Sequence, residues 1–338
     1  MNDYIFSVCI PVYNTEKYLP RALDSIIHQT FDLSKIEIVV VNDASPNTEE
    51  CTRIIEIYSK YLFIKYIIHD KNAGTFLARK TAIENSSGKY IFFLDPDDTF
   101  ELYAFEILSH HIIDSPDYIQ FLMYSIEDRK KCVLYLFLED EKNKTVEDVL
   151  QNKALHNIVN KCYNTEFLKK VCASFYEFYS IYAEDYYQSV VIEFYANKRK
   201  FIDIPLYNYF RHKGITSDVI LKNKIKLQNI IASFSNVQKN LIVFFEKNAQ
   251  LQYIQYINSY AKEFYNYLLD GAHSIQILMA ILNVLPADYR SPKLKTILIY
   301  LLRKMVYIVK KCIKNILPYG FVQIFRKLKN NFRIVKDS

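Results

Sequence analysis

Three carboxylates crowd one short turn of this chain, in the run Asp95-Pro96-Asp97-Asp98. Like charges this close repel one another unless a cation joins them. Hard oxygen ligands at this density suit Mg²⁺ or Mn²⁺, which proteins usually hold through one or two carboxylates together with substrate phosphates. The alternative interpretation is a solvated acidic turn that binds no ligand. The other motifs of the chain decide between the two interpretations.

Short apolar runs alternate with helical patterns over the first hundred residues. Wholly apolar strands separated by helices predict a parallel sheet covered on both faces. In such sheets ligands bind beyond the carboxyl ends of the strands. We expect strands at 5–12, 36–41, 63–68 and 90–94, and helices at 16–29, 48–61 and 75–85. The expected strand ends carry the polar runs 11–14, 42–45 and 95–98.

Beyond residue 100 the pattern becomes mixed. It predicts a helix to about residue 113, strands near 118–124 and 132–137, helical segments around 160–161 and 184–185, and helices from 222 to about 285. No internal repeat and no low-complexity segment is present.

Four motifs in the first hundred residues resemble the family 2 glycosyltransferases of the GT-A fold, in order and in spacing. They are Ser7–Asn14 with Glu16, Val40–Ser45, Asn72-Ala73-Gly74 with Ala78-Arg79, and Phe93–Asp98. The resemblance continues more weakly through 160–161, 184–186 and 209–212. It implies an α/β fold: a Rossmann-like, mixed but mainly parallel sheet flanked by helices, with a helical C-terminal extension.

The same resemblance implies a division of the chain. Residues 1–105 would bind the nucleotide-sugar and 106–221 would form the acceptor-side, catalytic half. A helical extension would follow at 222–289 and a basic amphipathic tail at 290–338.

Residue roles follow from the resemblance position by position. The donor nucleotide would be bound by Pro11, Tyr13, Glu16, Asp43, Arg79, Asp95 and Arg211. Asp43 would accept a hydrogen bond from the base, which suits the imide N–H of uracil. Arg79 would approach the diphosphate or hold the acidic turn. Asp97 would ligate Mn²⁺ or Mg²⁺, and His212, which lies near the phosphates in the family, is a second candidate ligand.

Asp185, in the pair Glu184-Asp185, resembles the general base of the family. Displacing a nucleotide diphosphate needs a base for the attacking hydroxyl and positive charge on the leaving group, which Arg and a metal supply. One base opposite the leaving group gives inversion. The alternative is a purely structural role for the pair, as an acidic helix N-terminus that the helix dipole favours.

The expected function is therefore an inverting, metal-dependent transfer from a nucleotide-sugar, most simply a UDP-sugar, to a hydroxyl of a glycan or lipid-linked glycan in surface polysaccharide synthesis. One alternative is a catalytically silent sugar-nucleotide-binding partner of another transferase. The other is a sugar nucleotidylyltransferase, which would need a Gly-rich phosphate loop that Val12-Tyr13-Asn14-Thr15 lacks.

Charge is divided unevenly along the chain. Residues 290–338 hold 13 Lys and Arg and a single acid, whereas the rest of the chain holds 30 bases and 36 acids. An acidic body argues against nucleic-acid binding. The apolar and basic faces of the tail predict contact between residues 294–336 and an anionic membrane surface. The alternatives are a helix packed on the body of the protein and a dimer contact. Without an export signal or CxxC pair, we expect a cytoplasmic protein on the inner face of the cell membrane.

Overall fold

The computed structural model describes residues 3–128, 130–134, 145–154, 156–211, 224–271 and 275–289. The chain divides into two units, Met1–Gly271 and Ala272–Ser338. The subdivision expected at residues 105, 221 and 289 is a different one, and it stays a prediction.

Within the described residues of the first unit, nine strands form one mixed sheet in the order β3-β2-β1-β4-β8-β6-β9-β5, with β7 paired to β6. The first four neighbours pair in parallel, and β8 joins β4 antiparallel. The strands are β1 (Phe6–Val12), β2 (Ile36–Asn42), β3 (Phe63–Ile68), β4 (Tyr90–Phe93), β5 (Thr99–Phe100), β6 (Tyr118–Glu127), β7 (Lys130–Leu134), β8 (Lys161–Asn164) and β9 (Arg199–Phe210). The mixed α/β sheet expected from the sequence is confirmed.

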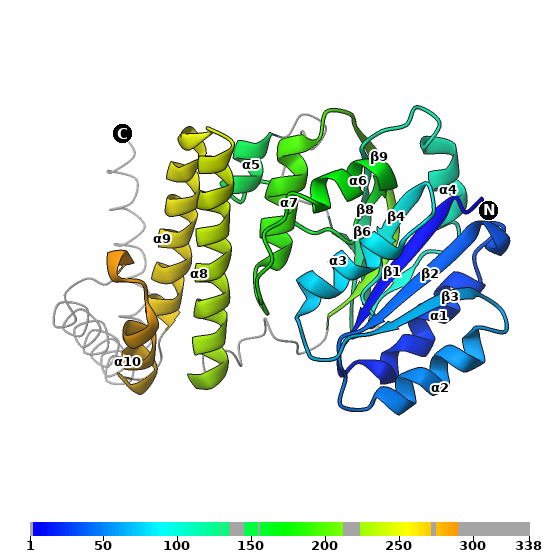
Figure 1. The fold of residues 1–338 in the computed structure, drawn as a ribbon, viewed down its shortest axis with the longest axis horizontal. Helices are drawn as coiled ribbons and strands as arrows, with labels where there is room; N and C mark the ends of the chain where they lie inside the picture. The colour runs from blue at the N-terminus through cyan, green and yellow to red at the C-terminus, as the bar shows by residue number, and fades with distance from the viewer. Residues whose placement is uncertain are drawn as a thin grey trace, which may run out of the picture. The chain divides into compact units, whose positions relative to one another are not determined.

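Helices cover both faces of the sheet, with α1 and α2 on one face and α3, α6 and α7 on the other (Figure 1). The helices of this unit are α1 (Leu19–Ile27), α2 (Thr48–Tyr58), α3 (Thr75–Asn85), α4 (Ala104–His111), α5 (Val146–Leu150), α6 (Thr165–Cys172), α7 (Glu184–Tyr195), α8 (Lys224–Lys247) and α9 (Ile254–Gly271). A short 3-10 turn, Glu16–Tyr18, precedes α1.

Aromatic side chains fill the core between these layers. On one face of the sheet Phe6, Phe92 and Phe105 lie ring to ring, with centroids 5.2–5.4 Å apart. On the other face Phe76 of α3 contacts Tyr187 of α7 edge to face at 5.6 Å. Such pairs add about 0.5–1.5 kcal/mol each beyond the area that they bury. The buried apolar strands predicted for β1 and β2 are confirmed, because every residue of both strands is buried.

The helical extension packs on the sheet domain through α7. Phe194 of α7 contacts Phe244 and Phe245 of α8 edge to face at 5.2 and 5.8 Å. α8 and α9 then lie side by side (Figure 1), joined by the stacked rings of Phe234 and Phe264 at 4.1 Å. The first unit therefore includes α8 and α9 within its own core.

Two expectations for the second half of the sequence need correction. The helical segment expected around residues 160–161 is wrong at Lys161, which begins β8 because its backbone pairs with Gln120 of β6. The strand β9 was not predicted. It mixes charged and apolar residues, contains Pro205, and pairs with β6 across register shifts.

In the second unit the structure describes α10 (Ile275–Val284) and a 3-10 turn at Ala287–Tyr289. The tail expected at 290–338, with its membrane-binding stretch 294–336, lies outside the described residues. Among the residues that are described, no helix is both long and apolar enough to cross a membrane.

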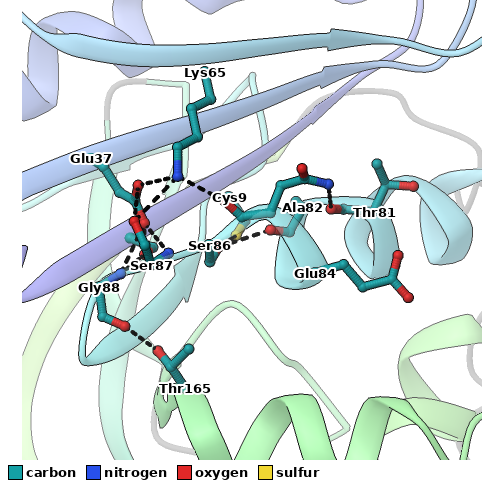
Figure 2. Close-up of polar contacts among 12 residues, drawn as sticks. Cys9, Glu37, Lys65, Thr81, Ala82, Glu84, Ser86, Ser87, Gly88 and Thr165 are labelled. Atoms are coloured by element: carbon teal, nitrogen blue, oxygen red, sulfur yellow. Dashed lines mark hydrogen bonds and ion pairs between the residues drawn. The ribbon is translucent and has the colours of Figure 1, made fainter. Parts of the chain in front are cut away.

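A buried carboxylate, Glu37, organises the amino-terminal edge of the sheet (Figure 2). It accepts hydrogen bonds from Ser7 Oγ at 2.5 Å, Gly88 N at 2.9 Å, and both N and Oγ of Ser87, and it pairs with Lys65 Nζ at 2.8 Å. Burial alone would raise the pKa of Glu37, but these donors outweigh burial and lower it. Hydrogen bonds and a cation directed at a carboxylate stabilise its ionised form.

The close approach at Glu37 needs Gly88. A Cβ on this residue would lie 2.7 Å from the carbonyl carbon of Phe6 and 2.8 Å from Ser7 N, which are backbone atoms that cannot move aside. Glycine therefore lets the turn before β4 approach β1 closely enough to donate to the carboxylate.

We expect Glu37→Gln to lower the free energy of unfolding by about 3–5 kcal/mol near pH 7, because one half of a buried ion pair loses its charge. A lowered pKa stabilises the folded state above the ordinary Glu pKa, and that contribution is lost as pH falls through the folded-state value. Urea unfolding from pH 7 to pH 3 should therefore show an acid-dependent loss that the variant lacks. Glu50→Gln, which removes the charge of Glu50 from its exposed ion pair with Arg53, is the control. Equal stability of Glu37→Gln and wild type would contradict this account.

Candidate functional site

The carboxyl ends of β1, β2 and β4 meet at one edge of the sheet, since the three strands run parallel. The residues that follow them include Tyr13, Asp43 and Asp95, so the polar strand ends singled out by the sequence lie together. This is the edge at which ligands bind in open α/β sheets.

Asp43 fixes the loop that leads into α3. Its Oδ1 accepts from His69 Nδ1 at 2.7 Å and from Ala73 N at 2.9 Å, and its Oδ2 accepts from Gly74 N at 2.8 Å. His69 is held in turn by Thr81 Oγ1, 2.9 Å from its Nε2. The carboxylate is 2% exposed, and Oδ2 keeps capacity for one more donor.

The residues expected around the nucleoside flank Asp43. Pro11 is buried within β1, and Tyr13 beyond the end of that strand is 47% exposed. Glu16 is 6% exposed, and its Oε1 has no hydrogen-bond partner among the described residues. A buried carboxylate oxygen without a donor is costly unless a ligand supplies one.

Arg79 of α3 joins the acidic turn after β4 to the start of α7. Its Nη2 donates to Asp95 Oδ1 at 2.9 Å and its Nη1 to Asp185 Oδ1 at 2.5 Å, with Glu184 Oε1 3.8 Å away. The guanidinium is buried. Ala183, which precedes the acidic pair, has a left-handed backbone with φ of 61°, and the pair occupies the first turn of α7, where the helix dipole favours anions.

The ionisation of this cluster is set by burial against charge. Burial alone would lower the pKa of Arg79, but Asp185, Asp95 and Glu184 outweigh it and raise that pKa. Burial raises the pKa of Asp185, and Arg79 opposes the increase without cancelling it. The pKa of Glu184 rises for the same reason, with Asp185 adding to the effect of burial.

Within the acidic turn the three carboxylates face different partners. Asp98 is buried and accepts from Tyr207 Oη and Phe210 N of β9, both at 2.8 Å. Burial, with Asp95 and then Asp97 as like charges, raises the pKa of Asp98 to about 8. Asp97 is half-buried, and its backbone carbonyl accepts from Arg21. Asp98 therefore fastens the turn to β9.

Arg211 directly follows β9, where its side chain is half exposed and lies 4.0 Å from Glu127. Its backbone N–H donates to Ile126 O at 2.9 Å. His212, the second candidate metal ligand, lies outside the described residues. The sequence analysis missed Tyr207, His69 and Thr81. The signal for Tyr207 was a strand-like alternation of apolar and polar residues, which a proline interrupts.

No three His, Cys, Asp or Glu side chains of the described ranges are grouped so that they alone could hold a metal ion. The carboxylates of Asp95 and Asp97 nevertheless have the chemistry that Mg²⁺ and Mn²⁺ prefer, because such ions take one or two carboxylates and complete their shell with water and phosphate. Asp98 does not fit, since both of its oxygens accept hydrogen bonds from β9.

Residues 7–170 match the family described as glycosyl transferase family 2. The chain is 42% identical over 114 residues to the glycosyltransferase GlyA of Streptococcus pneumoniae and 38% identical over 107 residues to the minor teichoic acid biosynthesis protein GgaB of Bacillus subtilis. These alignments cover 33% and 31% of this chain, and only 16% and 11% of the relatives' lengths.

Among solved structures, TarS 1–349 of S. aureus is similar, with a TM-score of 0.57 over 86% of both chains and 20% identity. Crystal structures of TarS 1–349 with UDP and with UDP-GlcNAc superpose with TM-scores of 0.53 and 0.55. This likeness confirms the expected GT-A fold.

We expect Arg79→Met to lower the free energy of unfolding by about 1–3 kcal/mol at pH 7, because half-buried carboxylates lose the cation that donates hydrogen bonds to them. Raised carboxylate pKa values mean that the folded state binds more protons than the unfolded state, so stability falls as pH rises above the solution pKa. Without Arg79 these pKa values rise further, and the deficit should grow between about pH 4 and pH 8. Urea unfolding across that range measures it.

Arg53→Met is the matched control, because Arg53 forms an exposed pair with Glu50 and should change stability little at any pH. A pH-independent deficit in Arg79→Met, or none, would show that the carboxylates do not depend on this guanidinium.

Proposed function

We propose that this chain, whose residues 7–170 match the glycosyl transferase family 2, transfers a sugar from a UDP-sugar to a hydroxyl of a glycan or lipid-linked glycan, with inversion. The observation that carries the proposal is Arg79, which brings Asp95, at the end of a sheet strand, within hydrogen-bond reach of the same guanidinium as Asp185, at the start of a helix.

The contacts near Asp43 support a nucleoside at the strand ends. The orphan Oε1 of Glu16 is an acceptor suited to a ribose hydroxyl. Tyr13 offers an exposed ring for a base, and Asp43 Oδ2 offers an acceptor for the imide N–H of uracil. The UDP and UDP-GlcNAc complexes of the structural neighbour TarS favour uridine as the nucleoside.

Asp185 is proposed to take the proton of the attacking hydroxyl. Its Oδ1 accepts from Arg79, which orients the carboxylate and leaves Oδ2 as the basic atom. The raised pKa makes this carboxylate a stronger base than an exposed aspartate, and positioned bases contribute typically about 10²–10⁴-fold in rate. One base acting once, on the face opposite the leaving nucleotide, gives inversion.

Asp97 is proposed to hold Mn²⁺ or Mg²⁺, with Asp95 beside it and His212 as a further candidate. The metal, when bound, would neutralise charge on the leaving diphosphate. Arg211, beyond the end of β9, is proposed to contribute positive charge to the same group. Tyr207 fixes the turn from behind, since its Oη donates to Asp98 and accepts from Asp95 N at 3.2 Å.

The acceptor and the cellular site are proposed from chemistry and from the relatives' names. GgaB is described as a minor teichoic acid biosynthesis protein, which favours a surface-polysaccharide acceptor. We propose that the basic residues within 294–336 hold the enzyme on the anionic inner face of the cell membrane, where a lipid-linked acceptor is presented to the cytoplasm.

Replacing Asp185 by Asn should separate binding from chemistry. We expect near-normal affinity for the UDP-sugar and a loss of transfer by at least about two orders of magnitude, because the base is gone while the donor contacts remain. UDP release in the presence of acceptor, with a panel of UDP-, GDP- and dTDP-sugars, measures transfer, and calorimetry measures binding.

Glu184→Gln is the matched control, because it changes the neighbouring acid in the same helical turn. If Asp185→Asn keeps more than a tenth of the wild-type rate while Glu184→Gln loses it, the base is Glu184. A wild-type protein that binds the donor but never releases UDP would instead be a silent binding partner.

Asp97→Asn should abolish metal-dependent transfer and leave the unfolding temperature unchanged, because the residue is proposed to act on the cation. Excess chelator should do the same to the wild type, with recovery on adding Mn²⁺ or Mg²⁺. Asp203→Asn, an exposed change on β9, should have no effect. Full activity in chelator, or in Asp97→Asn, would remove the metal from this account.

A further inference from the structure

Tyr179, in the segment between α6 and α7, carries an exposed aromatic ring close to the loop that Asp43 holds. The side chain is 52% exposed, whereas the next residue, Ser180, is completely buried. Two ring carbons of Tyr179 lie 3.5 and 3.6 Å from the position that a Cβ on Gly74 would take. Gly74 is the residue whose N–H donates to Asp43 Oδ2, so the ring lies beside the residue that holds that carboxylate.

The backbone under this ring is fixed. Ser180 Oγ donates to Tyr182 O at 2.7 Å and accepts from Tyr182 N at 3.3 Å. Ile181 N donates to Ser233 Oγ of α8 at 3.1 Å. Because the supporting chain is already ordered, a ligand that meets the Tyr179 ring has little conformational entropy to overcome.

Gly74 makes this approach possible. Its φ of 90° is disfavoured for residues with a side chain, and a Cβ there would lie 2.9 Å from Ser180 O. The loop that donates to Asp43 and the segment that carries Tyr179 are therefore packed backbone to backbone.

A second exposed ring belongs to Tyr13, the residue after Val12, whose carbonyl accepts from Asp43 N at 2.8 Å. Burial, followed by Tyr13 and then Asp43, raises the pKa of Tyr179, so all three groups lie within electrostatic reach. Among the described residues neither tyrosine ring has an aromatic partner. Two half-exposed rings beside a buried acceptor fit a planar heterocycle that carries an N–H.

We infer that Tyr179 is a nucleobase-binding residue, and that the pyrimidine of the donor lies against both Tyr13 and Tyr179 with its N–H directed to Asp43 Oδ2. This inference rests on the proposed UDP-sugar donor. Tyr179 lies outside residues 7–170, so the family match does not itself assign this role.

Calorimetric titration of the full-length protein with UDP, uridine and inorganic diphosphate tests the inference. Tyr179→Ala should weaken UDP and uridine binding by the same factor, roughly 5- to 100-fold, since a base loses one stacking surface. Diphosphate binding should not change. Tyr179→Phe should bind UDP as the wild type does, because the ring and not the hydroxyl makes the contact. Tyr267→Ala, which removes an even more exposed ring (65%) from α9, is the control.

The possible failures are distinguishable. If Tyr179→Ala binds UDP as tightly as the wild type does, this inference is wrong. The proposed function still stands in that case, because the wild type binds UDP. Equal weakening of diphosphate binding shows a general structural effect and also overturns it, as does a Phe variant as weak as the Ala variant. A wild-type protein that binds neither UDP nor uridine overturns the proposed function together with the inference.

Discussion

The buried guanidinium of Arg79 makes the hydrogen bonds on which the proposed donor site depends. Asp95, in the turn after β4, and Asp185, in the first turn of α7, lie 16 and 106 residues from Arg79 in sequence, and each accepts a hydrogen bond from its guanidinium. Without it, the half-buried carboxylates of Asp95 and Asp185 would repel one another. α3 carries this arginine about one turn after Gly74, which fastens the helix to Asp43. One helix thus sets the spacing between the nucleoside end and the proposed base.

The two edges of the parallel strands use buried charge in opposite ways. At the amino-terminal edge Glu37 is satisfied by five donors and its pKa is lowered, which is the arrangement of a stabilising carboxylate. At the carboxyl edge the pKa of Asp185 is raised and Glu16 Oε1 has no partner among the described residues. Such groups destabilise a fold unless a ligand completes them, and they concentrate at functional sites. The contrast favours the carboxyl edge as the proposed binding site and the amino-terminal edge as structural support.

Much of the donor half was predictable because its signals are local. The apolar run of β1 and the helical spacing of α3 identify their own elements, and parallel strands bring their ends to one edge. The rest depends on contacts made across the sequence. Asp98 looks like a metal ligand in the sequence, but it is buried by Tyr207, 109 residues later, on a strand that charged residues and a proline conceal. Tyr179 acquires its position from Gly74, which no local pattern reveals.

The most direct test of the central claim is the anomalous diffraction of crystals grown with UDP and Mn²⁺. The account predicts a single strong manganese peak at the carboxylate of Asp97, with the uracil at Tyr13 and Asp43 and the diphosphate between base and metal. An ordered nucleotide at any other part of the molecule would contradict it. So would a nucleotide bound at this edge with its manganese peak away from Asp97.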